Sequence, residues 1–255
     1  MALSGKTVFI TGATSGFGLA IARQCVSAYA NVVISGRRAD RLAEIAQELG
    51  ARAHAVTLDV RDNEAVVRAV AELPETFRNI DVLVNNAGLA LGLESFETQS
   101  LRHIEQMVDT NIKGLLYCTH AILPQMVAKN SGHIVNIGSV AGNHPYPGGN
   151  SYGGSKAFVK QFSLNLRADL LGKNIRVTNI EPGMAETEFS LVRFAGDTPK
   201  ADAVYNGIEA LSADDVADAV VWCITRPAHV NVNRIELMPT QQAFAGFAVH
   251  RENGA

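Results

Sequence analysis

The fold of this chain is decided by the stretch Lys6-Thr-Val-Phe-Ile-Thr-Gly-Ala-Thr-Ser-Gly-Phe-Gly18. It begins with a short apolar, β-branched run, passes through three glycines and continues into a helical pattern from Leu19 to Ala28. Gly12 permits a tight turn, Gly16 lets the backbone approach a ligand closely, and Gly18 lets a helix pack closely on a strand. The stretch therefore predicts a strand, a turn and a helix.

A turn of this kind brings backbone N–H groups and the positive end of a helix to one point, where phosphate groups bind. Glycines alone are also compatible with a flexible loop that binds nothing. Because strand and helix patterns flank the glycines in the right order, the stretch favours binding of a nucleotide pyrophosphate.

Strand and helix patterns alternate along the rest of the chain. The predicted strands are Val8–Thr11, Val32–Ser35, Ala53–Leu58, Val82–Asn85, His133–Ile137, Arg176–Ile180 and Ile235–Met238. The predicted helices, besides the first, are Arg38–Leu49, Asn63–Leu73, Asp109–Lys129, Ser151–Leu171 and Asp214–Thr225. This alternation predicts an α/β fold, a single Rossmann-like domain over residues 1–255 with a doubly wound parallel sheet and helices on both faces. The ligand of such a sheet lies at the carboxyl ends of its strands.

The composition argues against several other classes of protein. The 255 residues are 47% hydrophobic, enough for a substantial core, and the formal charge of −3 argues against a general nucleic-acid or membrane surface. The chain runs directly into its first strand without a signal or spanning segment, so a cytoplasmic protein is expected. Cys25, Cys118 and Cys223 are far apart in apolar surroundings, which predicts buried reduced thiols, and no Cys or His cluster has metal-ligand spacing.

Tyr152 and Lys156 stand four residues apart in a helical pattern, and Ser139 precedes them. Residues at i and i+4 share a helix face, so the Lys156 ammonium would lie near the Tyr152 phenol and lower its pKa from about 10. Ser139 would hold a substrate oxygen while Tyr152 exchanges the proton. The same spacing occurs in merely structural pairs, but the nucleotide-binding stretch favours a proton-transfer device.

These residues resemble the short-chain dehydrogenase/reductase family, and the resemblance covers nearly the whole chain. The matching pieces are Thr11-Gly-Ala-Thr-Ser-Gly-Phe-Gly18, Asp59, Asn85-Asn-Ala-Gly88, Asn111, Ser139, Tyr152 with Lys156, and Pro182-Gly183 followed by Thr187. The resemblance implies an enzyme that transfers hydride between a nicotinamide cofactor and a carbonyl carbon. It also implies that Asn111 holds a water in a proton relay through Lys156, within a catalytic tetrad of Asn111, Ser139, Tyr152 and Lys156.

The same resemblance implies which residues contact the cofactor. Asp59 would contact the adenine, the Asn85–Gly88 stretch would support the adenosine side, and Lys156 would also bind the nicotinamide ribose. Phe17 stands where the family more often has isoleucine, a change expected to affect packing only. The predicted cofactor contacts are Gly12, Thr14, Ser15, Gly16, Phe17, Gly18, Arg37, Arg38, Asp59, Val60, Asn86, Ala87, Gly88, Tyr152, Lys156, Pro182, Gly183 and Thr187.

The choice between NAD and NADP depends on Gly36-Arg37-Arg38, which closes the second predicted strand. An enzyme that uses NAD usually has a carboxylate here for the ribose hydroxyls, whereas guanidinium groups bind a 2′-phosphate. The alternative is that Arg37 and Arg38 are solvated residues that open a helix, where positive charge is slightly unfavourable. The sequence therefore predicts NADP(H) as the cofactor.

The residues after Pro182-Gly183 usually form a lid over the active site in this fold. Here they include Arg193, flanked by apolar residues, which would bind a carboxylate or a sulfonate, although a surface ion pair is the alternative. In the loop before Tyr152, His144 is a candidate for a second acid/base, but Tyr152 already fills that role, so hydrogen bonding within the loop is expected of it. The predicted substrate contacts are Ser139, Asn143, Tyr146, Tyr152 and Arg193.

Further stretches resemble one branch of the family, the bacterial NADP-dependent 3-hydroxy acid dehydrogenases, although Met184-Ala-Glu186 is shorter than the usual stretch there. That branch includes serine dehydrogenases, malonic semialdehyde reductases and sulfoacetaldehyde reductases, so the resemblance implies a small anionic aldehyde or 3-oxo acid and its alcohol as substrates. Two alternatives are a reductase of a larger neutral ketone and a non-catalytic dinucleotide-binding sensor. The stretches are Asn85–Gly92, Pro145–Asn150, Lys156–Arg167, Thr187–Phe194 and Pro227–Asn231.

The tail from Pro239 to Arg251 is too apolar for a solvated end, so Phe244 and Phe247 are expected to pack against a neighbouring subunit. The family usually forms tetramers in which two long helices pair across a two-fold axis, which implies a homotetramer or homodimer here. A tail that reaches the active site would add Gln241 or Arg251 to the substrate contacts.

Overall fold

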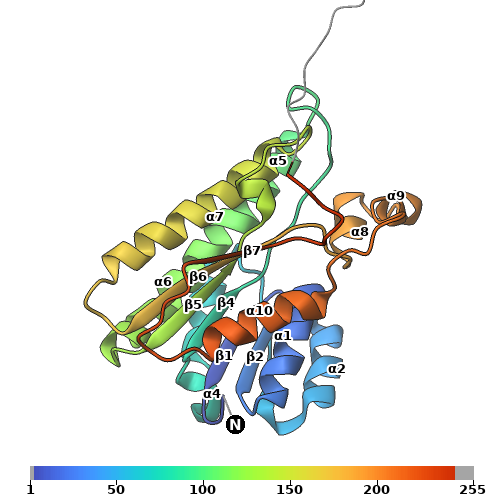
Figure 1. Ribbon diagram of the computed structural model, residues 1–255. Coiled ribbons are helices and arrows are strands. Elements are labelled where there is room, and N and C mark those ends of the chain that lie inside the picture. Colours follow the sequence, from blue (N-terminus) through green and yellow to red (C-terminus); the bar gives the residue numbers. More distant parts are fainter. Residues whose placement is uncertain (1–2, 245–255) are drawn as a thin grey trace, which may run out of the picture.

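A seven-stranded sheet forms the centre of the structure, a computed structural model that describes residues 3–244. All neighbouring strands are parallel, in the order β3-β2-β1-β4-β5-β6-β7. The predicted doubly wound sheet is confirmed, and each strand lies within two residues of its expected bounds (Figure 1). The strands are β1 Thr7–Thr11, β2 Asn31–Gly36, β3 Ala53–Thr57, β4 Val82–Asn85, β5 Gly132–Ile137, β6 Ile175–Pro182 and β7 Arg234–Leu237.

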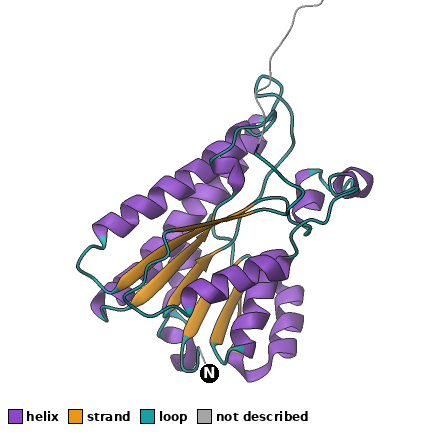
Figure 2. Ribbon diagram, in the orientation of Figure 1, coloured by secondary structure: helices purple, strands orange, loops and turns teal. Residues whose placement is uncertain are grey.

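Helices cover both faces of this sheet, as Figure 2 shows. Successive strand side chains point to opposite faces, so Val8 and Ile10 of β1 enter one core and Phe9 enters the other. The first core packs against α1 Gly16–Ser27, α2 Ala39–Leu49 and α10 Ala213–Ile224. The second packs against α3 Asn63–Ala71, α4 Glu75–Arg78, α6 Leu115–Ala128 and α7 Asn150–Asp169. The three cysteines are buried free thiols within these layers, as predicted.

The helix predicted over Asp109–Lys129 is different in the structure. It is preceded by α5 Leu101–Val108, continues through a π-helical turn at Asp109–Gly114, and only then becomes α6. The sequence analysis did not predict α5, although Leu101, Ile104 and Val108 recur at helical spacing; Met107 is its only buried residue. The short helices α4, α8 Phe189–Arg193 and α9 Thr198–Ala203 were also missed, since so few residues show no helical repeat.

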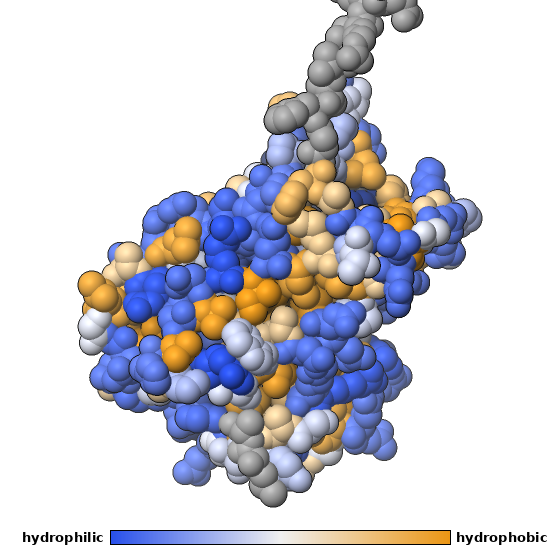
Figure 3. Space-filling model, in the orientation of Figure 1, coloured by the Kyte–Doolittle hydropathy of each residue, from blue (hydrophilic) through white to orange (hydrophobic). Residues whose placement is uncertain are grey.

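The position of the functional site follows from the strand order. The chain winds outward from β1 to β3 and then returns to place β4 on the other side of β1. The loops after β1 and β4 therefore leave the sheet in opposite directions and open a crevice at its carboxyl edge. α8 and α9 lie beyond this edge (Figure 1). Apolar surface gathers between them and the end of β7 in the space-filling view (Figure 3).

His133 is a buried imidazole in β5, and its environment predicts a pH dependence of stability. Its Nε2 lies 2.8 Å from Thr178 Oγ1, and burial, with a smaller effect from the Arg176 charge, holds its pKa well below the usual 6.5. Below pH 6.5 His133 binds a proton in the unfolded chain but not in the folded one. The free energy of unfolding therefore falls by up to about 1.4 kcal/mol for each unit by which the pH is lowered. Urea unfolding between pH 7 and 5 checks this, and an unchanged pH slope in His133→Gln would contradict it.

No helix of residues 3–244 combines the length and apolar composition needed to cross a membrane. Two residues for which the sequence predicts contacts, Phe247 and Arg251, lie outside the described residues.

Candidate active site

A cavity of about 400 Å³ lies at the carboxyl edge of the sheet, over the ends of β1, β2 and β4. Most of the predicted cofactor contacts line it. These are Gly12, Thr14, Ser15, Gly16, Phe17, Arg37, Arg38, Asp59, Val60, Asn86, Ala87, Gly88, Tyr152, Lys156 and Thr187. Other lining residues were not predicted, although most of them adjoin predicted ones in the chain, and they include Gly36, Arg61, Thr110, Gly138, Glu188 and Phe189.

Three predicted contacts lie elsewhere. Gly18 is behind the turn, where an added Cβ would fall 2.5 Å from both Gly12 O and Asn86 Nδ2, so its role is close packing. Pro182 and Gly183 line a neighbouring cavity of about 380 Å³. Phe17, expected to affect packing only, packs on the first core but also lines both cavities.

The glycine turn has the shape that a bound phosphate requires. Gly12 has a φ of +67°, and an added Cβ there would lie 2.9 Å from Ala87 Cα, so the loops after β1 and β4 meet without room for a side chain. Asn86 Nδ2 holds these two loops together by donating hydrogen bonds to Thr11 O and Gly12 O, each at 2.9 Å. Gly16, with φ +51°, then opens α1, and Gly16 and Phe17 line the cavity, so the N-terminus of α1 lies at its edge.

Guanidinium groups gather at one end of this cavity. Arg38 donates to the hydroxyls of Thr14 and Ser15, while Arg37 makes no hydrogen bond or ion pair with any residue from 3 to 244. Arg61 pairs with Asp59, whose pKa it lowers, mainly through the side-chain hydrogen bond. Guanidinium groups gathered in this way favour a strongly charged anion as the ligand at this end of the cavity.

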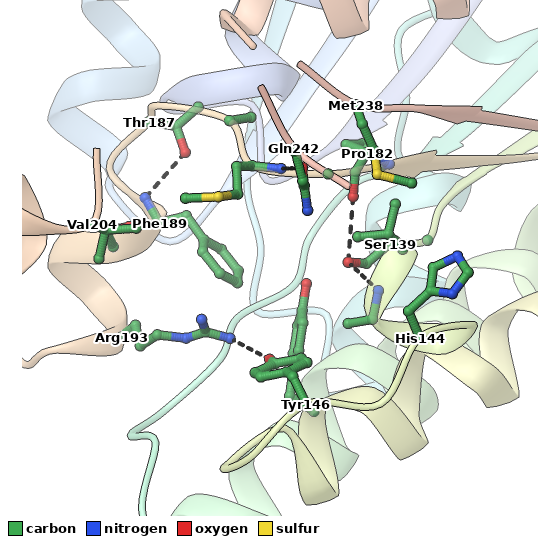
Figure 4. A pocket seen from close by; sticks show the side chains of 18 of the residues that line it. Ser139, His144, Tyr146, Pro182, Thr187, Phe189, Arg193, Val204, Met238 and Gln242 are labelled. Atoms are coloured by element: carbon green, nitrogen blue, oxygen red, sulfur yellow. Dashed lines mark hydrogen bonds between the residues drawn. The ribbon is translucent and has the colours of Figure 1, made fainter. Parts of the chain in front are cut away.

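The second cavity meets the first at Tyr152. Its walls come from the loop after β5, the segment after β6, α8 and the residues after β7 (Figure 4). Phe17, Gly138, Tyr152, Thr187 and Phe189 line both cavities. A group bound at the inner end of the first cavity would therefore face a small molecule in the second across Tyr152.

The structure brings Ser139, Tyr152 and Lys156 together at this junction. Ser139 follows β5, where its Oγ accepts a hydrogen bond from Ala141 N at 3.1 Å and donates to Pro182 O at 3.4 Å. Tyr152 lies in the first turn of α7, and Lys156 one turn later places its Nζ 5.8 Å from the centre of the Tyr152 ring. Lys156 Nζ donates to Ile137 O at 2.8 Å.

Asn111 sits in the π-helical turn, beside the same junction. Its Oδ1 accepts from Leu89 N and its Nδ2 donates to Leu89 O, both at 2.9 Å. A Cβ added at Gly88 would lie 3.3 Å from Asn111 Oδ1 and 3.4 Å from Lys156 Nζ, so the two side chains flank one glycine. The extra residue of a π turn re-aims a side chain locally, a distortion that is common at functional sites.

Burial dominates the protonation of the central pair. It raises the pKa of Tyr152 to about 12, and the Ser139 hydroxyl and the Arg193 charge act in the opposite direction. Burial also lowers the pKa of Lys156 to about 8. The sequence assigned the lowering of the phenol pKa to Lys156, but Arg193 is the cation that lowers it in this structure. Tyr152 is therefore protonated at neutral pH.

Arg193 extends from the end of α8 over the second cavity. Its guanidinium carbon lies 5.3 Å from the centres of the Tyr152 and Phe189 rings, and its Nη2 donates to Tyr146 Oη at 3.0 Å (Figure 4). Its Nε is buried without a hydrogen-bond partner in residues 3–244. Arg193 forms no ion pair within residues 3–244, and a half-buried cation whose Nε is buried without a partner favours a negatively charged ligand.

Asn143 requires a correction, because it does not line either cavity. Its Nδ2 donates to Glu181 and Glu236, at 2.6 and 2.8 Å, and its Oδ1 accepts from Lys160. Glu181 is buried and also paired with Arg234, so the network draws the Asn143 amide away from the substrate side. The sequence placed Asn143 in the right loop but gave no information on which way it points.

The segment after β7 contributes walls that sequence reasoning assigned to other residues. Gln241 binds Glu209 N and Gly207 O and does not line either cavity, whereas Gln242 lines the second one and accepts from Met184 N at 2.7 Å. Phe244 also lines it and packs on His144, with ring centres 4.5 Å apart. His144 Nε2 lies 3.3 Å from Glu236 Oε2. No group of His, Cys, Asp and Glu within residues 3–244 has the arrangement of a metal site.

Comparison with known proteins places this site in a family. A model described as short chain dehydrogenase matches residues 6–196. Serine 3-dehydrogenase of Agrobacterium fabrum is 52% identical over 97% of this chain and 99% of its own length. The NADP-dependent 3-hydroxy acid dehydrogenase YdfG of Salmonella typhi is 55% identical over 96% of this chain and 99% of its own.

Solved structures agree with these relatives. The closed form of a serine dehydrogenase complexed with NADP+ superposes with a TM-score of 0.96 at 53% identity, covering 96% of this chain and 100% of that one. Serine dehydrogenase from Escherichia coli superposes with a TM-score of 0.83 at 48% identity, over 93% and 100%. On its fold, its sequence and the residues gathered at its two cavities, the chain belongs to the short chain dehydrogenase family.

Proposed function

We propose that this protein is an NADP-dependent dehydrogenase that interconverts a small 3-hydroxy acid, or a chemically similar anionic alcohol, and its carbonyl form. The observation that carries the proposal is Arg193, a cation held over Tyr152 in the second cavity, with a buried Nε that lacks a partner in residues 3–244. The names of the relatives, serine 3-dehydrogenase and 3-hydroxy acid dehydrogenase, support the same class of substrate.

The first cavity fits NADP(H). The turn at Gly12 has no room for a Cβ, and the guanidinium of Arg37 lines the cavity without a hydrogen-bond partner in residues 3–244. Arg37 and Arg38 would hold the 2′-phosphate, the N-terminus of α1 the pyrophosphate, and Lys156 the nicotinamide ribose. When bound there, the cofactor supplies or accepts the hydride.

The chain's own residues provide the rest of the chemistry. Ser139 would hold the substrate oxygen by donating a hydrogen bond, and Tyr152 would give its proton to that oxygen in reduction and remove it in oxidation. Lys156 and Asn111, on either side of Gly88, would carry protons between Tyr152 and solvent. Phe189, Met184 and Phe244 line the cavity with apolar surface and keep water from the reacting carbon.

Arg193 would bind the acid group of the substrate, with Tyr146 Oη orienting the guanidinium from the side. The serine, malonic semialdehyde and sulfoacetaldehyde couples all have an anion within reach of one cation. We propose this set of substrates, together with a cytoplasmic location and a homotetramer or homodimer as the assembled form.

A panel of substrates tests the proposal. NADPH oxidation is followed with malonic semialdehyde, sulfoacetaldehyde and a neutral aldehyde of similar size, NADP+ reduction is followed with serine, and each assay is repeated with the cofactor that lacks the 2′-phosphate. We expect one anionic couple and NADP(H) to be clearly preferred. Equal turnover of the neutral aldehyde would contradict the anionic substrate, and a larger neutral ketone would become the better candidate.

A further inference from the structure

Glu188 is an acidic residue at the end of the first cavity where the guanidinium groups gather. It precedes α8, lines the cavity beside Thr14, Ser15, Arg37 and Arg38, and its Oε2 lies 3.0 Å from Arg38 Nη2. The ion pair joins the segment after β6 to the start of α2, across the end of the cavity that would hold the 2′-phosphate. A carboxylate beside a site for a phosphate is unexpected, because two negative charges repel each other.

The hydrogen bonds of Arg38 show what this ion pair does to the guanidinium. Nε donates to Thr14 Oγ1 at 3.2 Å, and Nη2 is within reach of three acceptors, Thr14 Oγ1, Ser15 Oγ and Glu188 Oε2. Nη2 has only two hydrogens, so these acceptors already share them. Only Nη1 has no partner within residues 3–244. A bidentate grip on a phosphate needs two nitrogens of the same edge, and Glu188 occupies one of them.

We propose that Glu188 is a specificity-determining residue that competes with the 2′-phosphate of the cofactor for Arg38 Nη2. The proposal rests on the NADP dependence proposed above. When the 2′-phosphate binds, Glu188 gives up Nη2, and this exchange lowers the affinity for NADP(H) below the value that Arg37 and Arg38 alone would provide. A cofactor without the 2′-phosphate leaves the ion pair between Glu188 and Arg38 in place. Removing the Glu188 charge therefore does not raise the affinity for that cofactor.

The ion pair between Glu188 and Arg38 is weak enough for a phosphate to replace Glu188. About half of each side chain is exposed, at 52% for Arg38 and 49% for Glu188, so solvent and salt screen the attraction. A phosphate carries more charge than a carboxylate and brings three acceptor oxygens, so it displaces Glu188 readily. The other contacts that hold α8, from Gly92 N to Arg193 O and from Arg193 to Tyr146, do not involve Glu188.

Calorimetric titration of the purified protein with NADP+ and with NAD+, without substrate, tests the proposal in Glu188→Gln. The amide removes the charge but keeps the size of the side chain. We expect the Kd for NADP+ to fall by about two- to fivefold, the upper part of the range of an exposed ion pair, and the Kd for NAD+ to change little. Glu186→Gln, an exposed carboxylate in the same segment that makes no ion pair within residues 3–244, is the matched control and should leave both values unchanged.

A double variant with Arg38→Ala isolates the contact. Glu188→Gln should have no effect on NADP+ binding in that background, because the shared nitrogen is gone. Unchanged or weaker NADP+ binding in Glu188→Gln alone would overturn the proposal, and weaker binding would mean that Glu188 orients Arg38 for the phosphate. Equal binding of NADP+ and NAD+ by the unaltered protein would contradict the proposed NADP dependence. The failure of that proposal can therefore be told apart from the failure of the proposed role of Glu188, which only the variants test.

Discussion

Replacing Tyr152 with phenylalanine is expected to lower kcat by about 10²- to 10⁴-fold, the usual contribution of a positioned general acid or base. The change removes one oxygen from a buried ring whose packing against Phe189 and the Arg193 guanidinium is otherwise preserved. Binding of NADP+, measured by titration, should be nearly unchanged, because most of the cavity proposed for the cofactor is formed by other residues. Steady-state kinetics in both directions, with the substrate that the panel selects, checks the expectation.

Tyr205→Phe is the matched control for this prediction. Tyr205 lines the same cavity, but its hydroxyl is bonded to Ser190 Oγ and Ala185 O in the lid segment. Loss of that hydroxyl should have a much smaller effect on kcat. Turnover that survives Tyr152→Phe would remove the proposed acid, and equal losses in the two variants would mean that cavity packing, not proton transfer, limits the rate.

Replacing Arg193 with methionine is expected to reduce kcat/KM for the anionic substrate by about 10²-fold, since a charged hydrogen-bonding partner is lost in a buried site. Turnover of a neutral aldehyde should change far less. Methionine keeps an unbranched apolar side chain beside the Tyr152 and Phe189 rings, and Arg193→Lys is the control that keeps the charge but not the planar fork. Equal losses on charged and neutral substrates would contradict the role of Arg193 as the anion site.

The Arg193→Met variant is also expected to change the pH dependence of the reaction rates. The charge of Arg193 lowers the pKa of Tyr152, opposing the burial that raises it to about 12, so removing the charge raises that pKa further. Oxidation of the alcohol needs the phenolate and reduction needs the phenol. At a given alkaline pH a smaller fraction of Tyr152 is then phenolate, so Arg193→Met should need a higher pH than the unaltered protein to show the same relative rise in oxidation rate, while reduction extends to higher pH. An oxidation profile that does not move would show that Arg193 acts on the substrate alone.

Local sequence patterns were sufficient for the sheet and for the glycine turn at the first cavity. Gly12 and Gly16 stand in a turn between a strand and a helix, and a parallel sheet brings the ends of its strands to one edge. Asp59 and Asn86 also line the first cavity, but the family resemblance, and not a local pattern, led us to expect them there. The short helices could not be predicted, because so few residues show no apolar repeat, whereas α5 was missed although Leu101, Ile104 and Val108 recur at helical spacing.

Side-chain direction is what the linear sequence left open. Asn143 was expected at the substrate, yet Glu181 from β6 and Glu236 from β7 draw its amide into a network with Lys160. Arg193 was expected to bind substrate, but its effect on the Tyr152 pKa appears only when α8 folds over α7. Such contacts join residues far apart in the chain.

The sequence by itself determined the order of strands and helices, the glycine turn and the spacing of Tyr152 and Lys156, because each depends on neighbours within a few residues. Tertiary structure alone decided which charged groups meet. Glu188 reaches Arg38 across 150 residues of chain, and Arg193 reaches Tyr152 across the mouth of the second cavity. Charge pairing depends on distance in space and on burial, and both exist only after the β6 segment and the helices of the two layers have packed around the carboxyl edge of the sheet.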